Sequence, residues 1–172
     1  MRGLLAAAAV AVAIAAGACS SEPPSPVAGL DVLGGVPRVA DAAGVLTAVD
    51  GDTLMLDDGL VLDLGPDVAT FSTYTLTLLP LDGRVGQYVH VGLADDGRVV
   101  WVAVVGNVTR AADGTSTVLV TSDLLLVHDG RAYFRDGTVL ATGPGVTVDG
   151  LPAYAFARID VATDLVIEIT VP

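Results

Sequence analysis

The chain has 172 residues and a formal net charge of −12 at pH 7, with eight arginines, no lysine and twenty acidic residues. This acidity opposes nucleic-acid binding, because the phosphates of nucleic acids are neutralised by lysine and arginine. The lack of lysine excludes a P-loop and Schiff-base catalysis, and the sequence contains neither a Gly-x-Ser-x-Gly nucleophile elbow nor a His-Glu-x-x-His zinc motif.

Residues 1–18, MRGLLAAAAVAVAIAAGA, carry one early basic residue, then an apolar run and a small-residue end. This pattern is typical of a secretory signal peptide, and the apolar run is shorter than the ~20 residues of a membrane-spanning helix. The next residue, Cys19, is the only cysteine, and the sequence AGAC that it ends resembles the bacterial lipobox, with Ala16 where leucine is usual. The resemblance implies a lipid anchor on Cys19; the alternative is a free or disulfide-linked cysteine.

The segment after Cys19, SSEPPSPVAG, is rich in serine and proline and has no hydrophobic periodicity, as expected of a flexible tether. Removing 18 of the 172 residues leaves 154, enough for one ordinary domain or two very small ones. We therefore expect a signal peptide at 1–18, a lipidated cysteine and tether at 19–42, and folded units at 43–105 and 106–172. The folded part would be exported and anchored to the membrane, facing the exterior or the periplasm.

Asp-Gly dipeptides punctuate most of this folded part. Glycine adopts positive φ freely and aspartate tolerates it, so the dipeptide favours tight hairpin turns of type I′. A calcium loop that begins at Asp50 is the alternative, but Leu54 would occupy its fifth position and Met55 the place of its required glycine. We therefore interpret the aspartates as turn residues and expect no metal. The eight dipeptides begin at Asp50, Asp58, Asp82, Asp96, Asp113, Asp129, Asp136 and Asp149.

Between these turns, short alternations of apolar and polar residues predict an all-β fold. The only candidate helix or turn lies at 73–83, where Pro80 limits its length. Strands 98–105 and 165–171 are apolar on both faces, which predicts that both are covered on two sides. The predicted strands are 44–50, 53–57, 60–64, 87–94, 98–105, 115–121, 123–128, 131–135, 138–141, 153–160 and 165–171.

Two pairs of similar segments, here called the internal echoes, predict a repeat of roughly 65 residues. The first aligns GVLTAVDGDTLML, from Gly44, with GNVTRAADGTSTVLV, from Gly106. The second aligns DGRVGQYVHVGLADDGRVVWVAVV, from Asp82, with DGLPAYAFARIDVATDLVIEITV, from Asp149. Each member of the second pair reads as a turn, a strand, a polar turn and an apolar strand.

The element order of the first unit, three strands, an irregular link and two strands, is that of an OB-like five-stranded barrel. Residues 44–105 resemble small OB-like domains of unknown function in bacterial exported proteins and lipoproteins, through the sequences GVLTAVDGDTLMLDDGLVLDL and DGRVGQYVHVGLADDGRVVWVAVV. The resemblance implies no catalytic residues. We expect two tandem OB-like small barrels, the alternative being one β-sandwich of about ten strands.

Histidines and aromatic residues offer few candidates for chemistry. His90 shares its predicted strand face with Tyr88, opposite Val89 and Val91, so we expect it to point outward, and His128 lies beside a turn. Trp101 lies among valines and alanines, which predicts a core position. The alternative is an aromatic platform with Phe71 that stacks on sugars or bases.

The candidate ligand-binding residues are arginines and tyrosines on two predicted strands of the second unit. In RAYFRDG, alternation places Arg131, Tyr133 and Arg135 on one strand face; in AYAFARID, it places Tyr154 and Arg158 together with Phe156. If the strands are neighbours, the stripes merge into a patch that binds phosphate, carboxylate or sugar groups. The alternative is that these arginines pair with acids such as Asp136 and Asp160.

These observations predict a non-enzymatic module of the bacterial envelope that binds an envelope polymer or a partner protein, or acts as an accessory structural part, without a cofactor and without nucleic acid. The alternative is an exported hydrolase that uses an aspartate pair. Such a pair requires one carboxyl with a raised pKa in an apolar cleft.

Overall fold

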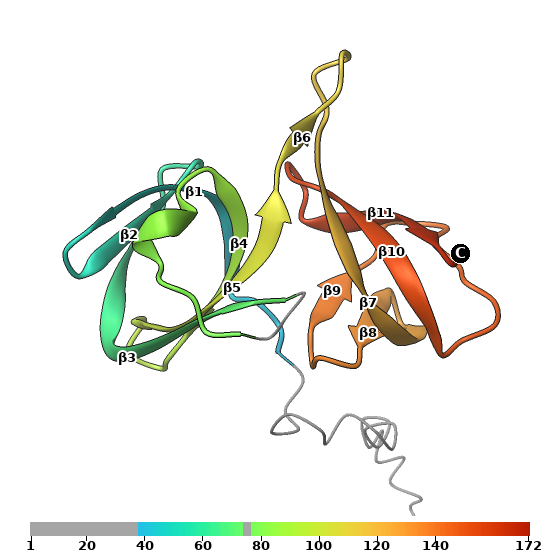
Figure 1. The fold of residues 1–172 in the computed structure, drawn as a ribbon, viewed down its shortest axis with the longest axis horizontal. Coiled ribbons are helices and arrows are strands. Elements are labelled where there is room, and N and C mark those ends of the chain that lie inside the picture. The colour runs from blue at the N-terminus through green and yellow to red at the C-terminus, as the bar shows by residue number, and fades with distance from the viewer. Residues whose placement is uncertain (1–37, 74–76) are drawn as a thin grey trace, which may run out of the picture.

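The computed structural model of the chain describes residues 38–73 and 77–172. The predicted signal peptide, Cys19 and nearly all of the tether lie outside these residues. Within them the fold is nearly all β, as predicted, and its strands form two units that lie side by side (Figure 1). The described residues include no helix long and apolar enough to span a membrane.

Unit 1 is a closed five-stranded barrel with the strand order β1-β2-β3-β5-β4. Strands β3 and β5 pair in parallel and the other neighbours pair antiparallel. One 3₁₀ helix, η2 (Asp82–Arg84), lies in the link before β4, within the segment predicted as a turn or short helix. The strands are β1 (Ala42–Asp50), β2 (Thr53–Leu56), β3 (Val61–Ser72), β4 (Gln87–Leu93) and β5 (Val99–Asn107).

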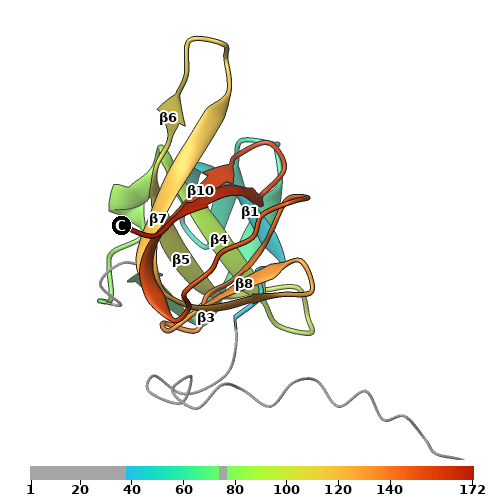
Figure 2. The same ribbon diagram turned by 90° about the vertical axis from the view of Figure 1, so that its right-hand side faces the viewer.

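Unit 2 is a six-stranded antiparallel sheet of order β11-β10-β7-β8-β9, with β6 paired to the start of β7. The β6–β7 hairpin projects away from both units in both views (Figures 1 and 2). The two outer strands of the sheet approach each other, because Thr142 forms a parallel bridge with Val166 and the Gly143 N–H donates to the Val166 carbonyl at 2.8 Å. The strands are β6 (Thr109–Arg110), β7 (Ser116–His128), β8 (Arg131–Phe134), β9 (Val139–Ala141), β10 (Ala153–Asp160) and β11 (Leu165–Thr170).

The two units share one pattern of strand pairing. In unit 1, the first half of β1 pairs with β4 and its second half with β2; in unit 2, the first half of β7 pairs with β10 and its second half with β8. The parallel bridge between the end of β9 and β11 stands where β3 and β5 form a parallel ladder. Unit 2 therefore repeats the strand order of unit 1, but it is a sheet whose outer strands meet at one parallel bridge, whereas only unit 1 forms one of the two expected closed barrels.

Only one of the two internal echoes aligns strands that occupy equivalent places in the two units. The second echo aligns the β4–β5 hairpin with the β10–β11 hairpin, which occupy equivalent places in the two units. The first echo aligns the β1–β2 hairpin with the β6–β7 hairpin, whereas the counterpart of β1 is β7. That alignment is out of phase because any Asp-Gly hairpin has the same local chemistry, whatever its long-range partners.

Several strand boundaries also differ from those predicted. Strand β7 runs unbroken through the expected break at 122, and β3 continues past Pro66 to Ser72 with a register shift against β5. The unit boundary expected after residue 105 falls inside β5. Strand β7 passes from β10 to β8 along its length, so the polar residues near its centre do not end it.

Backbone geometry confirms that the Asp-Gly dipeptides form turns. Glycine has positive φ in seven of the eight, the exception being Gly83 in η2. Only Asp129 also has positive φ, at 48°, so the other turns are not the expected type I′. Instead, the aspartate Oδ1 accepts the backbone N–H two residues later, which stabilises the turn locally. These bonds join Asp58 to Leu60, Asp96 to Arg98, Asp113 to Thr115 and Asp136 to Thr138.

Alternate residues of β4 belong to two different cores. Val89 and Val91 point into the barrel of unit 1, whereas Tyr88, which is 0% exposed, packs with residues of unit 2 such as Phe134 and Ile159. The prediction of two covered faces is thus confirmed for the second half of β5, where Val102 and Val105 lie in different cores, but not for its first half, where Val100 is 41% exposed. It is wrong for β11, because Ile167 on its outer side is 44% exposed.

We predict that Tyr88→Ala lowers the free energy of unfolding by about 3–5 kcal/mol, since truncating a large buried aromatic removes apolar contacts and leaves a cavity. Urea denaturation measures the change. Leu119→Ala, at a 52% exposed position of β7, is the control and should change stability by less than about 1 kcal/mol. A comparable loss in both variants would argue against a shared core beneath Tyr88.

Candidate functional site

Alternation along β8 and β10 places the predicted ligand-binding residues on the outer face of unit 2. Ala132, Phe134, Ala155 and Ala157 point inward and are 0% exposed. The predicted residues lie on the other side: Arg131, Arg135, Tyr154 and Arg158 are exposed and Tyr133 is partly buried.

The two stripes are not on neighbouring strands, because β7 lies between β8 and β10. Asp123 of β7 bridges the gap: its Oδ2 is 3.0 Å from Arg135 Nε, and its register partner on β10 is Tyr154. The structure therefore brings Arg135 and Tyr154 close to one aspartate. Arg131 lies at the other end of β8, opposite His128 in register.

On β10, the Tyr154 and Phe156 rings meet edge to face, with centroids 5.6 Å apart. Arg158 follows on the same side, and its Nε lies 3.2 Å from Glu168 Oε2 on β11. We call these six residues the β10 face: Asp123, Arg135, Tyr154, Phe156, Arg158 and Glu168. Its arginines pair with acids, as the alternative interpretation held, but with Asp123 and Glu168 instead of the expected Asp136 and Asp160.

A second aromatic pair lies on unit 1. Trp101, expected in a core, is only partly buried and lies on the outer surface of the barrel, its register partner on β4 being Gly92. Its ring centroid is 6.2 Å from that of Phe71, with a tilt of 40°, and the Arg38 guanidinium is 4.7 Å from the Phe71 centroid. The core prediction is wrong because β4 offers no side chain at Gly92, so the indole rests on the sheet surface.

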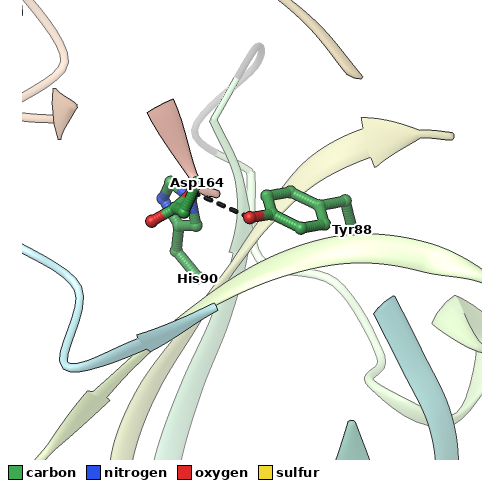
Figure 3. A network of polar contacts seen from close by, with 3 residues as sticks. All are labelled: Tyr88, His90 and Asp164. Carbon is green, nitrogen blue, oxygen red and sulfur yellow. Dashed lines mark hydrogen bonds and ion pairs between the residues drawn. The ribbon is translucent and has the colours of Figure 1, made fainter. Parts of the chain in front are cut away.

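His90, expected to point outward, is 4% exposed, because unit 2 covers this face of β4. Its Nε2 lies 2.9 Å from Asp164 Oδ1, and the Tyr88 hydroxyl donates to the same oxygen at 2.8 Å (Figure 3). Asp164 lies in the β10–β11 turn with φ of 53°, a left-handed conformation that is uncommon outside glycine. These three residues, the Tyr88–His90–Asp164 network, join the two units by side-chain hydrogen bonds.

The network links the units, because Tyr88 and His90 belong to β4 of unit 1 and Asp164 to the β10–β11 turn of unit 2. Two buried donors share one carboxylate oxygen, and losing that acceptor would leave both unpaired. Burial, and then the charge of Asp164, raise the pKa of the Tyr88 hydroxyl far above its ordinary value. His128, by contrast, is exposed beside its predicted turn, with Nε2 3.2 Å from Asp129 Oδ2.

An acidic cleft of about 690 Å³ lies where three turns meet, one from unit 1 and two from unit 2. Its aspartates are Asp57, Asp58, Asp113 and Asp160, and the Oδ1 of each accepts a backbone N–H. Hydrogen bonds from Thr115 lower the pKa of Asp113. In residues 38–73 and 77–172, no group of three or more histidine, cysteine, aspartate or glutamate side chains has the geometry to hold a metal ion.

Searches of protein-family models, curated proteins and solved structures found no match to this chain. Function is therefore inferred from the geometry and chemistry of these residues.

The raised pKa of Tyr88 makes stability depend on alkaline pH. An unfolded tyrosine ionises near pH ~10, whereas Tyr88 in the fold stays neutral, so its contribution is complete below pH ~10 and is lost as pH rises further. The expected loss is up to about 1.4 kcal/mol for each pH unit. We predict that the wild type loses stability more steeply than Tyr88→Phe between pH ~10 and ~11.5, measured by urea denaturation. Equal slopes would contradict the burial of this hydroxyl.

Proposed function

We propose that this chain is an exported, membrane-anchored, non-enzymatic module of the bacterial envelope that binds an uncharged stretch of an envelope polysaccharide. The observation that carries the proposal is the β10 face. There, an edge-to-face aromatic pair lies in the same row as Arg158, with Asp123 and Arg135 beside Tyr154, and each arginine is paired with a carboxylate.

The chemistry of the β10 face suits a sugar. The exposed Tyr154 ring, with the partly buried Phe156 beside it, can pack against the apolar face of a pyranose ring, while the arginines and carboxylates supply donors and acceptors for its hydroxyl groups. Each arginine on this face is neutralised by its partner, so no excess positive charge is left for phosphate or carboxylate ligands. This supports a neutral ligand over the anionic groups that the sequence also allowed.

The acidic cleft is the feature that the alternative, a hydrolase with an aspartate pair, would use. General acid catalysis needs one carboxyl whose pKa is raised. In the cleft, the hydrogen bonds from Thr115 lower the pKa of Asp113 instead. Within residues 38–73 and 77–172, burial raises the pKa of the Asp136 carboxyl, which lies outside the cleft and caps a turn through Thr138. This arrangement favours the binding module.

We predict that Tyr154→Ala with Arg158→Ala weakens retention on isolated cell-wall polysaccharide by about tenfold or more, as expected from losing an aromatic stacking partner worth about 1–3 kcal/mol. Co-sedimentation with the polymer measures retention. Arg110→Ala, an exposed arginine on the β6–β7 hairpin, is the matched charge control and should be retained like the wild type. Full retention of the double variant, with an unchanged circular dichroism spectrum, would refute the β10 face as the binding surface.

Membrane anchoring is proposed from the lipobox resemblance at Cys19, which lies outside the described residues. Metabolic labelling with a fatty-acid analogue should tag the wild type and not Cys19→Ala, and the variant should appear in the culture medium. Equal labelling of both proteins would refute the lipid anchor.

A further inference from the structure

We propose that Trp101 and Phe71 form a second, independent stacking site for a sugar ring, on unit 1. This site goes beyond the β10 face, because its residues belong to β3 and β5 of the other unit. Both rings are partly buried, and Trp101 lies on the outer surface of the barrel.

The indole of Trp101 lies flat against the barrel. A Cβ atom placed on Gly92 would be 2.0 Å from both Nε1 and Cε2 of Trp101, so the ring covers the β4 backbone where a side chain would otherwise stand. Gly92 and Trp101 are register partners on adjacent strands. One ring face is therefore against the sheet, and the opposite face is directed away from it.

Neighbouring groups fix the orientation of this platform. Phe71 lies beside the indole, with ring centroids 6.2 Å apart and ring planes tilted by 40°. The Arg38 guanidinium lies over Phe71, and one of its nitrogens donates to the Asp136 carbonyl, which anchors the arginine to unit 2. Because these contacts hold the rings in place before binding, little side-chain conformational entropy is lost when the ligand binds.

The charge of the molecule selects among the ligands that stack on indole. A nucleobase would bring phosphates to a chain with a net charge of −12 and no lysine. A quaternary ammonium group would meet the Arg38 guanidinium beside Phe71, and like charges repel. An uncharged pyranose has an apolar face that packs on the ring and carries no charge, so a neutral sugar is the ligand class that fits.

Trp101 is the only tryptophan in the chain, so its fluorescence reports on this site alone. We expect saturable changes in emission when the full chain is titrated with uncharged oligosaccharides: an N-acetylglucosamine hexamer, a glucan hexamer and a mannan hexamer. At least one should bind, and Phe71→Ala should weaken its binding severalfold. Gly92→Ala should abolish binding by displacing the indole, with circular dichroism and thermal melting confirming that both variants fold.

The matched control is Arg110→Ala, an exposed residue of the β6–β7 hairpin outside both aromatic pairs, which should leave the titration unchanged. Loss of polymer retention in Tyr154→Ala with Arg158→Ala tests the other site, so failure of one proposal is distinguishable from failure of the other. Two results would overturn the Trp101 site: no saturable change with any of the three oligosaccharides, or binding that survives in folded Gly92→Ala and Phe71→Ala. Tighter binding of a single-stranded deoxythymidine 12-mer than of every sugar would overturn the choice of ligand class.

Discussion

Burial of the outer face of β4 and β5 under unit 2 is the constraint on which the rest of the structure depends. A small barrel buries little apolar surface by itself, and a shared core adds to what each unit buries alone. Tyr88 and Val105 belong to strands of unit 1, but their side chains are buried in the core of unit 2. His90 is covered by the same contact and therefore needs a hydrogen-bond partner, which Asp164 supplies from the β10–β11 turn.

The junction also decides which surfaces stay open for binding. Outer positions near it on β4 are filled by Tyr88 and His90, whereas Gly92, two residues farther along, leaves room for Trp101 to lie on the sheet. In unit 2, the inner side of β10 packs in the shared core and its outer side carries the Tyr154 and Phe156 rings. The Tyr154 ring is thus exposed, whereas Phe71, Trp101 and Phe156 are partly buried outside the two cores.

Local sequence patterns predicted much of the fold. Alternation placed Ala155 and Ala157 inside and Tyr154 and Arg158 outside, and aspartate–glycine chemistry located the turns. The pairing of strands that are distant in the sequence could not be predicted from these local patterns. Nothing local shows that β7 separates β8 from β10, or that the first echo is out of phase. The position of His90 depends on a turn 74 residues away, at Asp164, and a strand with a polar residue on one side reads the same whether water or a second unit covers it.

The central claim is that the two units form one cooperative body, and equilibrium unfolding in urea tests it most directly. Trp101 fluorescence follows unit 1, and a fluorine label on the Tyr154 ring, detected by NMR, follows unit 2 in the same samples. A shared core predicts that the two probes report one midpoint and one slope. Two separated midpoints in the wild-type chain would contradict it, because the units would then unfold independently.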